Sequence, residues 1–364
     1  MIAVSQRSTI AACACVLGLV AVAAVTRQSA EAGVQQQTQL VSQFTPSAPV
    51  VDGVADPMWA DVPAMQVQAV GGANAGSHQV SVKSLYDAQD IYLLVQWDDP
   101  TESLQRFPWV KQDDGTWEQL GSGPAGDENE FYEDKLAFIW NTDAAIAGFD
   151  QAGCMVTCHV GEAGKPYGNK YTANEGEMGD IWHWKSVRTG SVGSVDDQYV
   201  DAVRYSETAP EAGRHSDPRT GGGYSNNVNE AGDGPAFTDA EQPAPPYWIV
   251  DAGKQPFTDT FSAGDEVAGI IVAPLQGDRG DVAGMAQYST GGWTLEISRP
   301  LVTGSQYDVQ FDDLGDTYHF GVAVFDNAQV RHSFQTGVSA LTFGEGPTPV
   351  AGTTWGQVKQ AQQE

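Results

Sequence analysis

The sequence predicts an all-β protein, an antiparallel β-sandwich with long loop insertions. Short segments with an apolar residue at every second position recur along the chain, as at 293–298, where Trp293, Leu295 and Ile297 alternate with polar residues. Glycine and aspartate separate these segments, and Gly291-Gly292 is typical of a hairpin turn. No long stretch has the 3.6-residue period of an amphipathic helix. Short strands with such turns are typical of sandwiches and barrels.

The expected strands lie on both sides of a loop-rich region. They are residues 80–86, 91–97, 135–140, 267–273, 293–298 and 318–325, with a turn at 88–90 between the first two. Residues 205–265 are rich in Gly, Pro, Asn and Asp. We expect a long structureless excursion that lies on the sandwich, because strands resume after it, and long insertions often carry function. This organisation predicts one domain, residues 33–345, and a flexible tail at 346–364.

The first residues predict a targeting segment. Arg7 precedes an apolar run at 10–25, and Ala30-Glu31-Ala32 is a cleavage signal. We therefore expect residues 1–32 to be a signal peptide, and an uncleaved membrane anchor is the alternative. A lipoprotein-like box that ends at Cys13 stands at the wrong end of the apolar run. No later stretch reaches the roughly 18 apolar residues that span a bilayer, so a periplasmic or exported protein with no membrane span after cleavage is expected.

The charge of the chain excludes one class of partner. The chain has 18 Lys and Arg against 47 Asp and Glu. Removal of residues 1–32 takes away Arg7, Arg27 and Glu31, which leaves 16 cations, 46 anions and a net charge of −30. Because phosphate contacts need Lys and Arg, we expect no nucleic acid partner. Such a surface can steer a cationic partner, and it is equally typical of a protein that stays solvated in high salt.

One stretch carries candidate chemistry. Gly153-Cys-Met-Val-Thr-Cys-His-Val160 places Cys154, Cys158 and His159 within six positions. Two thiols followed directly by His are how a c-type cytochrome holds haem, because the thiols add to the porphyrin vinyl groups and the His binds the iron. The usual spacing is C-x-x-C-H, and this chain has one residue more. A Cys154–Cys158 disulfide and a zinc site are the other interpretations of these residues.

Several stretches resemble a haem-binding domain family. This family includes the γ subunit of ethylbenzene dehydrogenase, γ subunits of related dimethyl-sulfoxide-reductase-type molybdoenzymes and free-standing periplasmic cytochromes. The similar stretches, in order, are 51–53 with 59–60, 90–100, 133–140, the Cys-Cys-His stretch, 180–185, 277–281, 293–299 and 320–326. The resemblance implies a β-sandwich, related to some carbohydrate-binding modules, with one haem lodged at its loops.

The chain departs from this family at both ligand positions. In the molybdoenzyme γ subunits the haem is b-type, and its ligands are a Met in the central stretch and a Lys just before a Ser. Here the central stretch carries Cys154, Cys158 and His159, and His332 stands before Ser333 in place of the Lys. The resemblance therefore implies a branch with one covalent c-type haem per chain and with His159 and His332 as the iron ligands.

Other candidate residues have less support. His183, between Trp182 and Trp184, is the rival of His332 for the second ligand position, although such a His is more typical of a packed residue. The remaining candidates are Met155 and Met178 as sulfur ligands, Lys185 as a propionate or structural partner, His78 and His215 without supporting context, His319 as a surface or cross-strand residue, and the acidic pairs Asp98–Asp99 and Asp196–Asp197 as turn residues or calcium ligands.

The predicted function follows from the ligand set. If two His bind the iron, no position is left for substrate or oxygen, so the chain is expected to carry electrons and not to be an enzyme by itself. We expect a periplasmic haem c electron-transfer protein, free or as the haem subunit of a respiratory redox complex, with a molybdoenzyme or another cytochrome as its redox partner. The alternatives are a b-type haem γ subunit of a molybdoenzyme and a carbohydrate-binding β-sandwich with a Cys154–Cys158 disulfide.

Overall fold

The computed structural model describes residues 38–121, 131–157, 171–204, 206–208, 213–239 and 247–346. The chain divides into two units, Met1–Gln35 and Gln36–Glu364, and all described residues belong to the second. The expected signal peptide, Cys158, His159 and the expected tail from residue 347 onward lie outside the described residues. Within the described ranges, no helix has the length and apolar character needed to cross a membrane.

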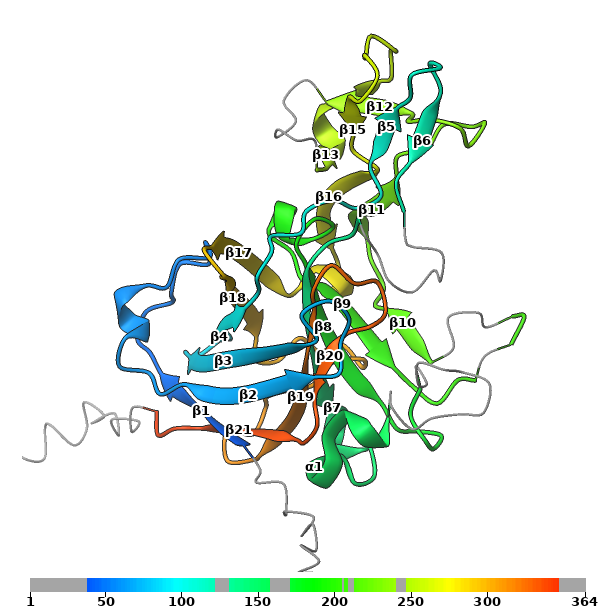
Figure 1. The fold of residues 1–364 in the computed structure, drawn as a ribbon. Coiled ribbons are helices and arrows are strands. Elements are labelled where there is room, and N and C mark those ends of the chain that lie inside the picture. The colour runs from blue at the N-terminus through cyan, green and yellow to red at the C-terminus, as the bar shows by residue number, and fades with distance from the viewer. Residues whose placement is uncertain are drawn as a thin grey trace, which may run out of the picture. The chain divides into compact units, whose positions relative to one another are not determined.

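One 13-stranded sheet forms most of the fold (Figure 1). Its main path, in spatial order, is β10 (Arg214–Ser216), β9 (Asp196–Val200), β8 (Gly179–Lys185), β7 (Lys135–Asn141), β19 (Tyr318–Phe325), β20 (Ser333–Gln335), β2 (Met65–Val70), β3 (Ser77–Tyr86), β4 (Asp90–Asp98), β18 (Gly292–Pro300) and β17 (Ala283–Ser289). All neighbours on this path pair antiparallel. In addition, β1 (Thr38–Phe44) pairs parallel with β3 and with β21 (Ser339–Phe343), which pairs antiparallel with β19.

The sheet folds back on itself into two layers around one core. Phe138 and Trp140 of β7 belong to the same buried cluster as Val80 of β3 and Val95 of β4, although these strands are far apart along the sheet. The three-residue strand β20 pairs with β19 on one side and with β2 on the other, so it is where one layer continues into the next. The predicted antiparallel β-sandwich is confirmed.

Aromatic side chains fill one layer of the core. The ring of Trp140 lies 4.6 Å from that of Phe320 and 5.0 Å from that of Trp182, measured between centroids. Because large aromatic side chains bury the most apolar area per residue, they dominate the energetics of such a core. The predicted strands at 80–86, 91–97, 135–140, 293–298 and 318–325 all lie within strands of this sandwich.

The predicted strand at 267–273 is interrupted. The structure has β15 (Glu266–Val267) and β16 (Ile270–Gln276), separated by Gly269. A Cβ atom on Gly269 would lie 1.8 Å from the carbonyl oxygen of Phe107, so the two backbones approach too closely for any side chain. The chain therefore changes sheets at this glycine.

The excursion at 205–265 is not structureless. Besides β10, it contributes to small sheets formed by β11 (Gly221–Asn226), β16 and β13 (Ile249–Val250), and by β12 (Phe237–Asp239) and β14 (Lys254–Pro256); a third small sheet joins β15, β5 (Trp109–Lys111) and β6 (Trp117–Gln119). The buried side chain of Asn227 organises this region, because its amide nitrogen donates to Phe237 and Ala268 (2.9 and 2.8 Å) and its oxygen accepts from Ala236 (3.0 Å). The side-chain amide of Asn227 thus provides hydrogen-bond partners for three backbone groups of this region.

The helices of the described chain are short. They are the α-helix α1 (Phe149–Ala152) and the 3-10 helices η1 (Pro57–Trp59), η2 (Thr142–Ala144), η3 (Gly153–Val156), η4 (Gly190–Val192), η5 (Asp251–Gly253) and η6 (Asp278–Gly280). The pair α1 and η3 lies at one end of β7 and β19 (Figure 1), which brings the Cys154 turn to the sheet.

A buried ion network ties β8 and β9 to η6. Asp196 of β9 forms ion pairs with Lys185 of β8 and with Arg279 of η6. Tyr224 and Gln198 also donate hydrogen bonds to Asp196, at 3.0 and 3.1 Å. Burial by itself would raise the pKa of Asp196, but the charges of Lys185 and Arg279 hold it well below its usual value. The carboxylate is therefore ionised and fully compensated.

We predict that Asp196→Asn lowers the free energy of unfolding by about 3–5 kcal/mol at pH 7, because it leaves buried cations without a partner. Urea denaturation measures this change. Because the pKa of Asp196 is lower in the folded chain than in the unfolded chain, its contribution is present above the unfolded pKa of about 3.9 and is lost as the pH falls from there toward the folded pKa.

Asp259→Asn is the matched control, because Asp259 pairs with Lys111 at an exposed position. Surface ion pairs contribute little to stability, so this variant should unfold as the parent does. Equal effects of the two substitutions at pH 7 would contradict the role assigned to Asp196.

Candidate functional site

Strands β8, β7, β19 and β20 have a second face, directed away from the aromatic core. Residues alternate between the faces of a strand, so this face carries the neighbours of the core residues. We call it the outer face; it consists of Lys135, Ala137, Ile139, Ile181, His183, Lys185, Gly321, Ala323, Phe325, His332 and Phe334. The strand register gives it a central row in which Phe334 faces Ala323, Ala323 faces Ala137, and Ala137 faces His183.

The centre of the outer face is made of small residues. Ala137 and Ala323 lie side by side in the central row, and Gly321 lies in the next row beside Ile139. Larger side chains stand at the ends of the central row, because Phe334 and His183 occupy them. Ala137 and Ala323 also pack against Ala73, Phe325 and Ala328, so the centre is an apolar surface bordered by imidazole and aromatic rings.

Phe325 contacts both imidazoles of the outer face. Its ring centroid lies 4.7 Å from that of His332 and 5.3 Å from that of His183. The Lys135 ammonium lies 4.0 Å from the same centroid and donates to the Gln329 carbonyl oxygen at 3.0 Å. Contacts of this kind restrict the rotation of both imidazole rings, and Phe325 therefore positions them.

The imidazole of His183 is oriented and neutral, so its Nε2 atom can donate a lone pair to a metal. Its side chain is 5% exposed, and its Nδ1 lies 3.3 Å from Oε1 of Gln198. An amide oxygen only accepts, so Nδ1 carries the proton and Nε2 presents a lone pair. Among the described groups, this Nε2 atom is buried without a hydrogen-bond partner. Burial, followed by the charges of Lys185 and Lys135, holds the pKa of His183 well below its usual value, so the ring is neutral, as in histidines that bind metals.

Cys154 lies over the Gly321 end of the outer face. Its side chain is 6% exposed, packs with Ile139 and Ile181, and has its sulfur 3.8 Å from the carbonyl oxygen of Gln335. A Cβ atom on Gly321 would be 3.8 Å from Cβ of Cys154, which places the cysteine in direct contact with this part of β19. Gly153 has φ of 57°, and its own Cβ would lie 2.4 Å from the Gly337 carbonyl oxygen, which explains why a glycine precedes the cysteine.

The structure brings Cys154 and His332 to the same face. Gly321, under Cys154, and Phe325, beside His332, are four residues apart on β19, which is about 13 Å at about 3.3 Å per residue. His159 follows Cys154 by five positions, and five residues span at most about 17 Å. The chain length thus allows His159 to reach the region of His332, although Cys158 and His159 themselves lie outside the described residues.

The other sequence candidates are placed as follows. His78 is buried with Nδ1 2.7 Å from the Asp98 carbonyl oxygen; His215 stacks on Tyr199 at 5.0 Å; His319 is half-buried in β19 opposite Ala340; Met155 is exposed; Met178 is half-buried; and Lys185 pairs with Asp196. The interpretation of Asp196–Asp197 as turn residues is wrong. Both lie inside strand β9, opposite His183 and Trp182, so their side chains point to opposite faces of the sheet.

Sequence reasoning missed two groups of buried carboxylates. Asp99, Asp134 and Asp326 form one, and Asp180, Asp197 and Asp308 form the other; within each group, one oxygen of each residue lies within 4.8 Å of the others. The members come from distant parts of the chain and share no local motif. The acidic pairs Asp98–Asp99 and Asp196–Asp197 were the available signal, and each pair supplies one member.

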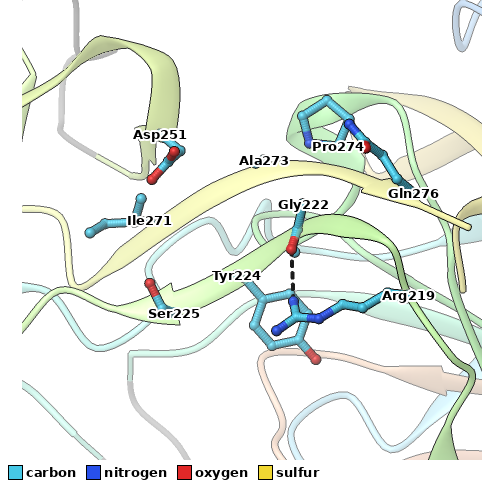
Figure 2. A pocket seen from close by; sticks show the side chains of 10 residues that line it. Arg219, Gly222, Tyr224, Ser225, Asp251, Ile271, Ala273, Pro274 and Gln276 are labelled. Atoms are coloured by element: carbon cyan, nitrogen blue, oxygen red, sulfur yellow. Dashed lines mark hydrogen bonds between the residues drawn. The ribbon is translucent and has the colours of Figure 1, made fainter.

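A shallow open pocket lies on β11 and β16 (Figure 2). Its lining residues are Arg219, Gly222, Gly223, Tyr224, Ser225, Asp251, Ile271, Ala273, Pro274 and Gln276. Arg219 donates to the Gly222 carbonyl oxygen at 2.7 Å, and the hydroxyl of Tyr224, the aromatic residue of this lining, donates to Asp196 at 3.0 Å. The side chains of Arg219 and Tyr224 are thus both engaged in hydrogen bonds within the protein.

Comparison with known proteins identifies the family. The family model described as ethylbenzene dehydrogenase matches residues 56–337, most of the chain. The chain belongs to the ethylbenzene dehydrogenase family. The match includes every strand of the outer face together with Cys154 and His332. The predicted family is confirmed, and no curated protein matches the chain.

Several solved structures are weakly similar. A carbohydrate-binding module of family 9 from Caldicellulosiruptor kristjanssonii, in complex with glucose, has 9% sequence identity and a TM-score of 0.34, covering 87% of this chain and 100% of that chain. A putative carbohydrate-binding protein from Bacteroides uniformis has 10% identity and a TM-score of 0.31, covering 84% of this chain and 99% of that chain. We base no functional assignment on similarities of this size.

We predict that His183 makes the stability of this family member depend on pH between 6 and 5. The unfolded chain binds a proton at His183 below its usual pKa of about 6.5, whereas the folded chain does not, so unfolding becomes easier as the pH falls. In His183→Phe this contribution is absent. The difference in free energy of unfolding between parent and variant should therefore change by about 1 kcal/mol between pH 6 and pH 5. Urea denaturation at both pH values measures it, and identical pH dependence of the two proteins would show that His183 is protonated in the folded chain.

Proposed function

We propose that this chain is an exported haem c electron-transfer protein, either free or as the haem subunit of a respiratory oxidoreductase complex. The observation that carries the proposal is the outer face, where Cys154 and His332 lie at the two ends of a floor of small residues. Cys158 and His159 follow Cys154 within five positions and complete a haem-attachment motif. Membership in the ethylbenzene dehydrogenase family supports a role beside a redox enzyme.

The residues of the outer face fit a haem. Cys154 and Cys158 would supply two thiols for covalent attachment, and His159 and His332 would supply the imidazole ligands of the iron. Ala137 and Ala323 form an apolar surface that packs against Phe325 and Ala328, and Ile139 and Ile181 extend this surface. When bound, the haem supplies a one-electron redox centre.

His159 and His332 would both bind the iron of the proposed haem, which would leave no position for substrate, so the haem would carry electrons. Phe325 keeps the ring of His332 in place, and the burial of Cys154 keeps water from the attachment site. Nitrogen ligands on both sides favour a lower reduction potential than a His/Met pair.

His183 is a second candidate for the distal ligand. Its support is the buried Nε2 atom without a hydrogen-bond partner among the described groups, together with a neutral ring fixed through Nδ1. His332 is half-buried, and its Nδ1 lies 3.1 Å from the Val330 carbonyl oxygen, which leaves its Nε2 directed away from that contact. The resemblance to the family favours His332, because it stands where the family has its second iron ligand. Spectra of variants distinguish His332 from His183.

The expected partner is a redox protein with a cationic docking surface, a molybdoenzyme or another cytochrome. The excess of 46 Asp and Glu over 16 Lys and Arg after residue 32 supports electrostatic steering toward such a surface. The apolar run at 10–25 with its cleavage signal supports export. Outside the cytoplasm, the chain would both acquire its haem at the thiols and encounter the respiratory oxidoreductases of this family.

We predict that the haem is covalently attached. Acid acetone extracts non-covalent haem into the organic phase, whereas haem held by thioethers stays with the protein. Cys154→Ala and Cys158→Ala should each weaken attachment, and the double variant should lose it. Met155→Leu is the control, since Met155 is an exposed residue between the two thiols and should leave attachment unchanged. Extraction of the haem from the parent protein would show b-type binding, and a purified exported protein without a Soret band would refute the haem function.

We predict that His332→Ala opens one side of the iron. The expected result is a high-spin spectrum and carbon monoxide binding in the reduced state, with the haem still attached, because the thioethers and His159 are unchanged. His183→Ala is the matched variant and should leave the iron low-spin. The reverse outcome, low-spin iron in His332→Ala and open iron in His183→Ala, would assign the distal ligand to His183.

A further inference from the structure

A group of buried carboxylates lies between the layers of the sandwich, on the core side of β8 and β9. Asp180 of β8 and Asp197 of β9 are fully buried, and Asp308, from the segment between β18 and β19, is 2% exposed. One oxygen of each lies within 4.8 Å of the others. Asp217, just after β10, is also buried, and half-buried Asp281 follows η6. Three carboxylates from separate segments of the chain therefore meet, and Asp217 and Asp281 both lie close enough to interact electrostatically with Asp197.

Several oxygens of this group have no partner. Among the described groups, Oδ1 of Asp180, Oδ2 of Asp197, Oδ1 of Asp308 and both oxygens of Asp217 are buried without a hydrogen bond. The second oxygens of two of these residues are held firmly. Oδ2 of Asp180 accepts from the Trp182 indole and the Val309 amide at 3.1 and 3.0 Å, and Oδ2 of Asp308 accepts from the Thr303 hydroxyl at 2.6 Å. Asp180 and Asp308 are thus each fixed by one oxygen and leave the other without a hydrogen bond.

The positive charge of Arg299 does not balance the negative charge that these carboxylates carry when they are ionised. Arg299 of β18 is buried and reaches the group, with Nη2 2.9 Å from Asp308 and 3.7 Å from Asp180. One guanidinium against five carboxylates leaves a net charge of −4 if all five are ionised, in a site removed from water. Ionised carboxylates in such a site need compensating positive charge, because isolated buried charges are costly.

We propose that Asp180, Asp197 and Asp308, supported by Asp217 and Asp281, form a Ca²⁺ site. Calcium takes six to eight oxygen ligands at about 2.3–2.6 Å, so two ligand oxygens on opposite sides of the ion lie about 4.8 Å apart, the limit that these carboxylates satisfy. The group offers only carboxylate oxygens, without the Cys or His that zinc and other transition metals prefer. Magnesium usually retains several waters and binds through one or two carboxylates, which fits a group of five less well.

The group formed by Asp99, Asp134 and Asp326 has fewer buried oxygens without a hydrogen-bond partner among the described groups. Both oxygens of Asp134 accept backbone hydrogen bonds, from Ser103 at 2.7 Å and from Asn327 at 2.9 Å. Asp326 accepts from the Ala75 amide at 3.0 Å, and in this group Oδ2 of Asp99 is the buried oxygen without a partner among the described groups. Asp99 is therefore a suitable control residue, since it is equally buried and acidic but lies in a group with one such oxygen instead of several.

A calcium ion at this place would join the strands of one layer to segments of the other. Asp180 and Asp197 belong to β8 and β9, Asp308 precedes β19, and Asp281 precedes β17. The ion would thus act as a cross-link that binds the folded chain and not the unfolded one, which raises stability in proportion to the logarithm of its concentration. This inference does not depend on the haem proposal.

Metal analysis and thermal unfolding of the full-length exported protein test the proposal. We expect one calcium per chain after purification without chelator. Removal by EGTA should lower Tm by several degrees, and Ca²⁺ should restore it, whereas equal Mg²⁺ should restore it less. Absence of bound calcium together with a Tm that neither EGTA nor Ca²⁺ changes would overturn the proposal, and it would show that protons neutralise the group.

Variants locate the site. Asp197→Asn and Asp308→Asn should weaken Ca²⁺ binding about tenfold or more in calorimetric titration of EGTA-treated protein, because calcium affinity depends on the number of charged ligands. Asp99→Asn should leave the affinity unchanged. Calcium binding that Asp99→Asn weakens and Asp197→Asn and Asp308→Asn do not would overturn the assignment to this group. If the two site variants do not fold, the measurements on the unmodified chain still decide whether calcium is bound.

Discussion

Strict alternation along β7, β8 and β19 is the constraint on which both the core and the candidate site depend. Trp140 and Trp182 point into the core, while Ala137 and His183, on the same strands, point to the outer face. A slip of one residue in the pairing would exchange the two sets, placing His183 in the aromatic core and a tryptophan on the outer face. The register that packs the core is therefore also the register that assembles the site.

The buried carboxylates of Asp196 and Asp197 have different electrostatic surroundings. Asp196 has Lys185 and Arg279 beside it, and its pKa is accordingly lowered. One residue further along β9, Asp197 points to the other face and enters a group of carboxylates in which Arg299 is the neighbouring cation, and burial raises its pKa well above the usual value. Two adjacent aspartates thus have opposite electrostatic surroundings, since the sheet separates them.

Strand β8 links the two proposed sites. His183 lies on the outer face, where the haem is proposed, and Asp180 lies on the core side, where calcium is proposed. The two residues are three positions apart and belong to one rigid strand that pairs on both sides, with β7 and β9. A cation that holds β8 and β9 together would therefore also hold the strand register beneath the outer face.

The amino-acid sequence by itself determined the positions of five strands of the sandwich, the sandwich class and the family, because alternation and turn residues are local patterns and the similar stretches occur in a set order. The predicted strand at 318–325 coincides with β19 (Tyr318–Phe325). Cys154 was selected as a candidate by the thiol-histidine motif, and His332 by its position in the resemblance to the family. Only the tertiary structure decided that β20 carries the sheet from one layer to the other, that Gly269 interrupts a strand, that His183 faces the same surface as His332, and that Asp180, Asp197 and Asp308 meet. Each of these depends on cross-strand register or on backbone contact between residues far apart in the chain, and a local pattern of residue types does not encode which distant segment will be the neighbour.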